Sequence, residues 1–168
     1  VATHVAVVDP GVGTARPPIA IRTGRGDVLI GPDNGLLIDA AEALGGLVEA
    51  RAIQNRDLML PVITSSFHGR DIFAPVAGHL ASGVAFESVG PLVPVGSLVR
   101  LAPVRPVIGD GLLESVIVHV LIFGNTTFAG TPADLDAAIG PLTPQRPLVL
   151  EFPATSTAPA VEEHTVWG

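Results

Sequence analysis

Short hydrophobic runs broken by glycine and proline set the pattern of the first half of the chain. Each run is only a few residues long and lies between polar or turn-forming residues, which is typical of buried strands. The Gly-Arg-Gly-Asp turn at residues 24–27 is short enough to join two strands directly. The runs predict four strands, at residues 5–8, 19–22, 28–30 and 47–53.

Apolar residues recur at helical spacing in two places. Between residues 36 and 44 leucine and alanine fall on one helix face, and Gly45-Gly46 ends the pattern. A second helix is predicted over residues 73–80, where Pro75 is tolerated because it lies in the first turn. Strands that alternate with helices predict an α/β fold, with a mainly parallel sheet covered by helices.

A change of composition divides the chain near its middle. Residues 89–106 are rich in proline, glycine and valine and have no helical period, which predicts a domain boundary. We expect an α/β domain at residues 1–95 that carries the nucleophile-activating residues. A smaller, incomplete, β-rich and barrel-like domain is expected at residues 96–168.

The second domain contains three element signals. Residues 115–123 form its clearest strand pattern, and residues 148–152 form its last. Thr131 is placed to cap a short helix over residues 132–139. The strand signals outweigh the helical one, so this domain is expected to be mostly β.

Composition and charge exclude several classes of function. The 168 residues are 48% hydrophobic and 15% charged, with a mean hydropathy of +0.53, which is typical of a folded chain with a core. The net charge is −7 and lysine is absent, so no nucleic-acid partner is expected. No apolar run reaches the roughly 18 residues of a membrane span, so no membrane partner is expected.

Cysteine usage and the N-terminus bear on the cellular context. The absence of cysteine excludes disulfides and thiolate zinc sites and, with no visible signal peptide, fits a cytoplasmic location. The chain starts inside an apparent strand without a methionine, so we expect the native N-terminus to be missing.

Residues 7–16, VVDPGVGTAR, form the most informative loop. A phosphate-binding interpretation fails, because Arg16 replaces the third glycine of G-x-G-x-x-G, two prolines follow, and the P-loop lysine is absent. One remaining interpretation is a plain type II turn, with Pro10 second and Gly11 third. The other is chemical, since Arg16 can fold back toward Asp9 at a strand end, where α/β sheets bind ligands.

Residues 65–71, SSFHGRD, form a polar loop before the second helix. His68 is either a packing or capping histidine or a general base, with Gly69 leaving room beside it. We interpret Arg70 and Asp71 as a local ion pair or as charges at the start of the helix rather than as catalytic groups. The sequence contains no G-x-S-x-G elbow, which weakens the hypothesis of a serine hydrolase. The histidines do not have the spacing of zinc ligands, so no metal site is predicted.

Three long segments, in order, resemble one family: HVAVVDPGVGTAR (residues 4–16), IGPDNGLL (30–37) and FHGRDIFAPVAGHLA (67–81). They resemble the S-adenosylmethionine (SAM) hydroxide adenosyltransferases. These are the adenosine-forming SAM hydrolases, which are related to the fluorinase and the chlorinase. HVLIFGNTTF (residues 119–128) is similar, more loosely, to a later F-G-N segment of the family.

The resemblance implies that Asp9, Arg16 and His68 act on one water molecule. The implied reaction is attack of water or hydroxide on ribose C5′ of SAM, which gives adenosine and L-methionine. The leaving group is a neutral thioether, so no general acid is needed, and no cofactor is expected besides SAM as the substrate. A guanidinium favours the anion of a bound water, His68 can accept its proton, and Asp9 can orient it.

A SAM-dependent halogenase is the weaker alternative within the family. The related halogenases carry tyrosines at the positions of Asp9 and His68, and this chain has no tyrosine. A carboxylate at Asp9 would also repel an incoming halide. Gly69 stands where the fluorinase carries a serine that helps to bind fluoride, and the resemblance places Gly69 in the substrate site.

The second domain matches the family only in part. Asn125 resembles a family asparagine that contacts adenine, and the resemblance implies that Phe123 packs on the base. An equal interpretation is that both residues simply belong to a glycine-containing turn at the end of a strand. Apolar residues 120–122 replace the aspartate expected just before F-G-N, and we expect the family's N-terminal ribose-binding and C-terminal adenine-binding segments to be missing. A non-catalytic adenosine- or SAM-binding or structural fragment therefore stays open. The family's trimers place sites between the first domain of one subunit and the second of the next, so a homotrimer is expected.

Overall fold

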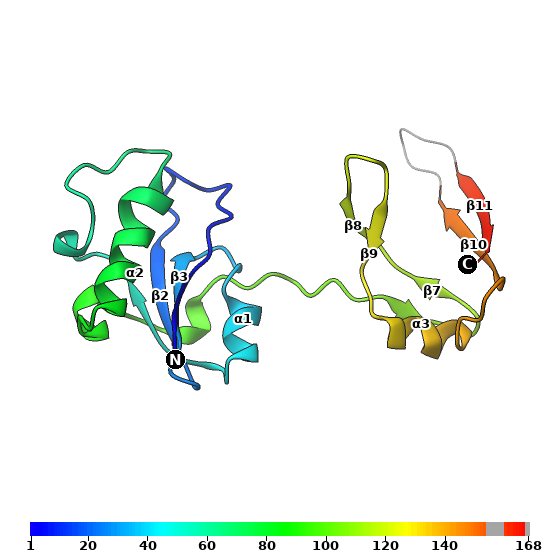
Figure 1. Ribbon diagram of the computed structural model, residues 1–168, viewed down its shortest axis with the longest axis horizontal. Helices are drawn as coiled ribbons and strands as arrows, with labels where there is room; N and C mark the ends of the chain where they lie inside the picture. Colours follow the sequence, from blue (N-terminus) through cyan, green and yellow to red (C-terminus); the bar gives the residue numbers. More distant parts are fainter. Residues whose placement is uncertain (154–159, 167–168) are drawn as a thin grey trace. The chain divides into compact units, whose positions relative to one another are not determined.

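The computed structural model describes residues 1–153 and 160–166. The chain forms two compact units, Val1–Ala102 and Pro103–Gly168 (Figure 1). In the part of the chain that is described, no helix is both long and apolar enough to cross a membrane.

The first unit is built on a five-stranded sheet with the strand order β1-β3-β2-β4-β5. Its strands are β1 Thr3–Val5, β2 Pro18–Thr23, β3 Val28–Pro32, β4 Leu47–Ala52 and β5 Leu92–Val93. The α/β class is confirmed, and the sheet is mixed rather than mainly parallel. Only β1 and β3 pair in parallel, while β2–β3, β2–β4 and β4–β5 are antiparallel. The turn between β2 and β3 forces this, because parallel neighbours need a long crossover connection.

Two helices cover opposite faces of this sheet. Side chains alternate between faces along a strand, so Ala20 points away from Ile19 and Ile21 in β2. Ala20 joins the hydrophobic cluster that contains Phe73 and the α2 helix (Ala74–Ala81), whereas Ile19 and Ile21 join the cluster under α1 (Ile38–Ala43). The predicted helices are confirmed, and the first unit has a helix–sheet–helix arrangement (Figure 1).

Short helical turns complete the first unit. A single π-helical turn leads directly into α2, and Pro75 lies in the first turn of that helix as predicted. The short turns are η1 Arg56–Leu58, η2 Gly69–Phe73, η3 Phe86–Val89 and η4 Val95–Ser97.

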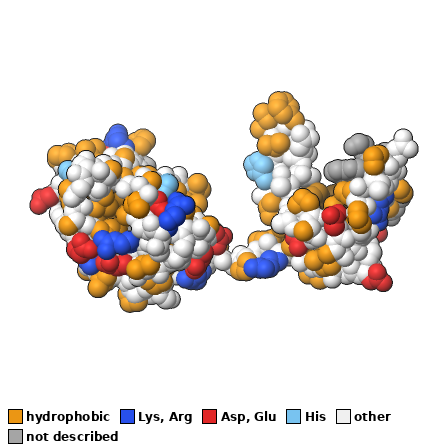
Figure 2. Space-filling model, turned by 60° about the horizontal axis from the view of Figure 1, so that its bottom comes forward, with side chains coloured by type: hydrophobic (Ala, Val, Ile, Leu, Met, Phe, Trp, Pro, Cys, Tyr) orange, Lys and Arg blue, Asp and Glu red, His pale blue; other side chains and the backbone are white. Residues whose placement is uncertain are grey.

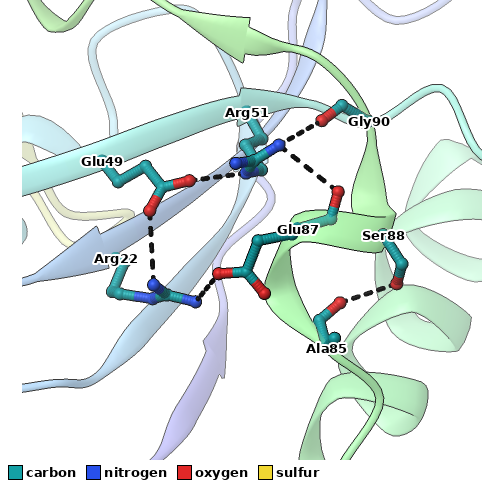
Figure 3. A network of polar contacts seen from close by, with 7 residues as sticks. All are labelled: Arg22, Glu49, Arg51, Ala85, Glu87, Ser88 and Gly90. Atoms are coloured by element: carbon teal, nitrogen blue, oxygen red, sulfur yellow. Dashed lines mark hydrogen bonds and ion pairs between the residues drawn. The ribbon is translucent and has the colours of Figure 1, made fainter.

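A polar network fastens η3 to strands β2 and β4 of the sheet (Figure 3). Arg22 of β2 donates to Glu49 of β4 at 3.3 Å and to Glu87 of η3 at 2.8 Å. Arg51 donates to Glu49 at 2.6 Å, and the Arg22 guanidinium stacks 4.4 Å from the centre of the Phe86 ring. The network is structural, because each of its charges is matched within it.

The predicted buried strand over residues 5–8 is wrong. β1 ends at Val5, and the chain then leaves the sheet after a last bond from the Ala6 N–H to the Ile30 carbonyl at 3.0 Å. Val5, Val7 and Val8 are exposed. An apolar run shows that a segment is hydrophobic, but it does not show whether the segment lies at the edge of a sheet or in its middle.

The second unit is β-rich, as predicted, but its described residues form three separate two-stranded antiparallel sheets and not a closed barrel. One helix, α3, begins with the predicted Thr131 cap, and Thr131 and Asp134 form a reciprocal capping box. The elements are β6 Val107–Ile108, β7 Leu113–Glu114, β8 Ile117–Val120, β9 Thr126–Phe128, α3 Pro132–Ile139, β10 Pro147–Phe152 and β11 Val161–Val166.

The single strand predicted over residues 115–123 is shorter in the structure. β8 ends at Val120, and a turn then leads into β9. In this turn the Gly124 N–H donates a hydrogen bond to the Leu121 carbonyl. Hydrophobic side chains lie exposed along this β8–β9 hairpin (Figure 2). Of the described hydrophobic residues of this unit, only Ala129 and Ala138 are buried.

Candidate active site

The loop from Asp9 to Arg16, called the Asp9 loop below, is made of two successive turns. The Val12 N–H donates to the Asp9 carbonyl at 3.2 Å, and the Thr14 N–H donates to the Gly11 carbonyl at 3.1 Å. A turn at Asp9 is therefore confirmed. Its predicted type II form is wrong, because positive φ falls at Gly13 (78°) and not at Gly11.

The turns bring Asp9 and Arg16 together, which is one of the two interpretations that the spacing left open. Arg16 Nη2 donates to Asp9 Oδ2 at 2.5 Å, and only 8% and 4% of the two side chains are exposed. The same Nη2 atom lies 3.1 Å from His68 Nδ1. The structure thus joins residues 52 positions apart into one cluster, Asp9–Arg16–His68.

The hydrogen-bond roles in this cluster follow from the chemistry of arginine. A guanidinium has donors and no acceptor, so His68 Nδ1 must accept from Arg16. His68 is then neutral in this arrangement, with its proton on Nε2. The guanidinium also lies 5.4 Å from the centre of the buried Phe73 ring, within the range of a cation–π contact.

Three polar atoms of the cluster are buried without a partner in the described residues: Asp9 Oδ1, Arg16 Nε and Arg16 Nη1. Leaving such atoms unpaired is costly, and native proteins rarely do so away from functional sites. One acceptor and two donors are therefore available to a water molecule or to a substrate group.

Close backbone contacts support the Asp9 loop. A Cβ on Gly13 would lie 2.6 Å from the Ser65 carbonyl, so the glycine allows this loop to touch the segment that carries His68. Asn34 Nδ2 donates to the Val8 carbonyl at 2.8 Å, one residue before Asp9. Asn34 lies in the IGPDNGLL segment, but nothing in its spacing showed this contact with Val8.

Residues 64–71, called the His68 loop, are closed by a buried carboxylate. Asp71 Oδ2 accepts from the Thr64 N–H at 2.8 Å and from the Thr64 hydroxyl at 2.7 Å. Asp71 Oδ1 accepts from Arg70 Nε at 2.6 Å, which confirms the predicted local ion pair. The bond from Arg70, followed by those from Thr64, holds the pKa of Asp71 well below its usual range.

The other predicted substrate residues lie in different surroundings. Gly69 begins η2, and a Cβ there would meet only Val7 side-chain atoms at 3.8 Å and beyond, so there is room beside His68. Phe123 and Asn125 belong to the second unit, in the turn of the β8–β9 hairpin, where both are exposed. No group of three or more His, Asp or Glu in the described residues could hold a metal ion.

Comparison with known proteins places the chain in a family. Residues 1–90 match the model of the SAM hydroxide adenosyltransferase N-terminal domain. The chain belongs to this family, and all three residues of the Asp9–Arg16–His68 cluster lie in the matched region.

Individual relatives agree with this assignment. An (R)-S-adenosyl-L-methionine hydrolase of Salinispora arenicola is 50% identical over 137 residues, 81% of this chain and 52% of that protein. A fluorinase of an Actinoplanes species is 31% identical over 80% of this chain and 45% of that protein. The crystal structure of an uncharacterized conserved protein from Thermotoga maritima matches 98% of this chain and 58% of its own, with a TM-score of 0.71 and 32% identity. The chain spans about half the length of the curated relatives it matches.

Proposed function

We propose that this protein hydrolyses SAM to adenosine and L-methionine. A water oxygen attacks ribose C5′, the C5′–S bond breaks, and its electron pair leaves with sulfur as the neutral thioether of methionine. The water loses one proton to the protein. Support comes from the hydrolase relatives and above all from the buried, unpartnered Asp9 Oδ1, Arg16 Nε and Arg16 Nη1.

Each member of the cluster has a distinct role in this reaction. Asp9 Oδ1 accepts a hydrogen bond from the water and orients it, while an Arg16 N–H stabilises the developing hydroxide. His68 cannot take the proton while its Nδ1 accepts from Arg16. It becomes the base when Arg16 turns that N–H toward the hydroxide and leaves Nδ1 open.

The proposal needs no metal and no cofactor. A sulfonium already carries the charge that makes its thioether a good leaving group, so neither an acid nor a Lewis acid has to assist the departure. Gly69, Phe123 and Asn125 are proposed to contact the substrate, and the protein is proposed to work as a cytoplasmic homotrimer. The hydrolase relatives support SAM as the substrate.

The test is incubation of the purified protein with SAM, with adenosine and methionine quantified by liquid chromatography. Asp9→Asn and His68→Gln are expected to lower the rate by about 100-fold or more, because each removes a group that acts on the water. His79→Gln on the exposed part of α2 and Asp39→Asn at the start of α1 are the matched controls, and they should retain the wild-type rate. Wild-type rates in both cluster variants would overturn the roles assigned here.

Binding without turnover is the second candidate. Apolar Val120, Leu121 and Ile122 stand where the family resemblance leads us to expect a methionine-binding aspartate. Calorimetric titration with adenosine and SAM separates the two candidates, since tight binding with no released methionine favours a binding protein. A 5′-halogenated product in the presence of chloride or fluoride would instead indicate a halogenase.

A further inference from the structure

Asp71 is a fully buried carboxylate for which the proposed reaction has no direct use. It lies in η2, three residues after His68. Both of its oxygens are engaged, Oδ2 by two donors of Thr64 and Oδ1 by Arg70. Three donors on one buried carboxylate make a strong and geometrically defined contact.

The bonds of Asp71 fix both ends of the His68 loop. Thr64 at one end is bound to the Asp71 side chain, and the Asp71 N–H at the other end donates to the Phe67 carbonyl at 2.9 Å. The Asp71 carbonyl accepts from the Leu60 N–H at 2.9 Å, so the approach to the loop is held as well. His68 therefore lies on a segment whose two ends are held together by the side chain and backbone of Asp71.

The same loop supports the Asp9 loop. Ser65, the residue after Thr64, is the one whose carbonyl lies against Gly13. A shift of Thr64 would move Ser65 and His68 together, and it would change both the Gly13 contact and the 3.1 Å contact between His68 Nδ1 and Arg16. Asp71 thus acts on the cluster through the backbone without touching it.

We propose that Asp71 is a positioning residue, which holds His68 Nδ1 against Arg16 by closing the His68 loop through Thr64. The expected change in kcat rests on the proposed hydrolysis of SAM. The expected tautomer of His68 is independent of that reaction, because it follows from the contact with Arg16 alone. The low pKa of Asp71 agrees with this positioning role, since the carboxylate stays charged at neutral pH.

The variant Asp71→Asn removes the charge while preserving the volume of the side chain. One oxygen becomes an NH2 donor that must face either Arg70 or Thr64, which also donate, so at least one contact is lost in either orientation. The expected result is a kcat about tenfold lower with KM within about twofold. His68 Nδ1 has to face Arg16 and the water beside it in order to take the proton when the Arg16 N–H turns to the hydroxide, so a displaced ring affects the chemical step more than binding.

Asp27 provides the matched control. It is a second buried aspartate that accepts from a neighbouring arginine, Arg25 Nε at 2.5 Å, and from a backbone donor, the Ala2 N–H at 2.7 Å. It lies in the turn before β3 and contacts none of the cluster. Asp27→Asn should lower stability in the same way as Asp71→Asn and leave kcat unchanged.

Nitrogen-15 NMR of labelled histidines gives a readout that needs no activity. The His68 signals are identified by their loss in His68→Gln, and in the wild type they should show a proton on Nε2 and none on Nδ1. Asp71→Asn should give a mixture of tautomers, whereas Asp27→Asn should not. If the wild type fails to hydrolyse SAM while Asp71→Asn shifts the tautomer, the proposed function falls and the positioning role stands.

An unchanged His68 tautomer in Asp71→Asn would overturn the proposal, whatever the activity. If Asp71→Asn does not fold, Thr64→Val takes its place, because it removes the hydroxyl donor to the same carboxylate. Thr64→Ser keeps that hydroxyl and should restore both kcat and the tautomer. Equal behaviour of the valine and serine variants would also overturn the proposal.

Discussion

At the scale of single residues, two buried carboxylates contribute to the response of the protein to acid. Hydrogen bonds from Arg25 to Asp27 and from Arg70 to Asp71 lower the pKa of both aspartates below their ordinary value of 3.8. A carboxyl whose pKa is lower in the folded state stabilises that state at pH values above its unfolded pKa. This stabilisation is lost as the pH falls from about 4 toward the folded pKa.

We therefore expect the melting temperature of the wild type to fall steeply below about pH 4. The variants Asp27→Asn and Asp71→Asn should melt lower at neutral pH but lose less on acidification, since each lacks one group that has to be protonated. Circular dichroism melts between about pH 6 and pH 2.5 measure this. Parallel curves for wild type and variants would show that neither carboxylate contributes to the acid response.

The residues of the site were predictable to different degrees. Asp9 and Arg16 lie in one short loop, so their spacing allowed a contact but left a plain turn open as well. The partnership with His68 spans 52 positions, and only the family resemblance predicted it. Phe73 and Asn34 were missed as supports of the cluster, because a hydrophobic helix residue and a turn asparagine look the same in sequence whether or not they contact a site.

At the scale of elements, the contact between the Asp9 loop and the His68 loop depends on Gly13. The variant Gly13→Ala introduces a Cβ at positive φ and only 2.6 Å from the Ser65 carbonyl. Gly83→Ala is the matched control, since Gly83 also has positive φ (97°) but no atom within 4 Å of the added Cβ. The difference between the two variants isolates the effect of the backbone contact from the cost of the conformation.

Gly83→Ala should destabilise the protein by about 1 kcal/mol, the usual cost of a left-handed alanine, and leave the rate of the proposed hydrolysis unchanged. Gly13→Ala should destabilise it by more and should lower kcat, because the two loops must move apart. Urea denaturation and steady-state kinetics measure both quantities. Equal effects of the two alanines would mean that the loops are not held together at Gly13.

Periodicity predicted most elements of the first unit because α1, α2, β2 and β3 are amphipathic or fully buried. It failed for residues 5–8 and 115–123, where apolar side chains are exposed in the structure. A hydrophobic pattern predicts burial. A hydrophobic segment that lies exposed at a sheet edge or on a hairpin is therefore wrongly predicted to be part of the core. The antiparallel pairing of most strands was also missed, although the short turn at residues 24–27 already required the two strands that it joins to be antiparallel.

At the scale of the whole molecule, the two units differ in how much core they contain. Both hydrophobic clusters of the described residues lie within Val1–Ala102. The described part of Pro103–Gly168 buries only Ala129 and Ala138 among its hydrophobic residues, while Ile122 and Phe123 are 94% and 86% exposed. Burial of apolar area is the main source of folding free energy, so the two units should differ in their ability to fold alone.

We expect a fragment of residues 1–102 to melt in one cooperative transition and to keep the His68 tautomer of the whole chain, since every contact of the Asp9–Arg16–His68 cluster lies within it. A fragment of residues 103–168 should show no cooperative melt and should bind a hydrophobic dye, because its apolar side chains have little core to enter. Circular dichroism and dye fluorescence on both fragments test this. A cooperative melt of residues 103–168 alone would mean that this unit forms a core of its own, and failure of residues 1–102 to fold would mean that the site depends on the second unit.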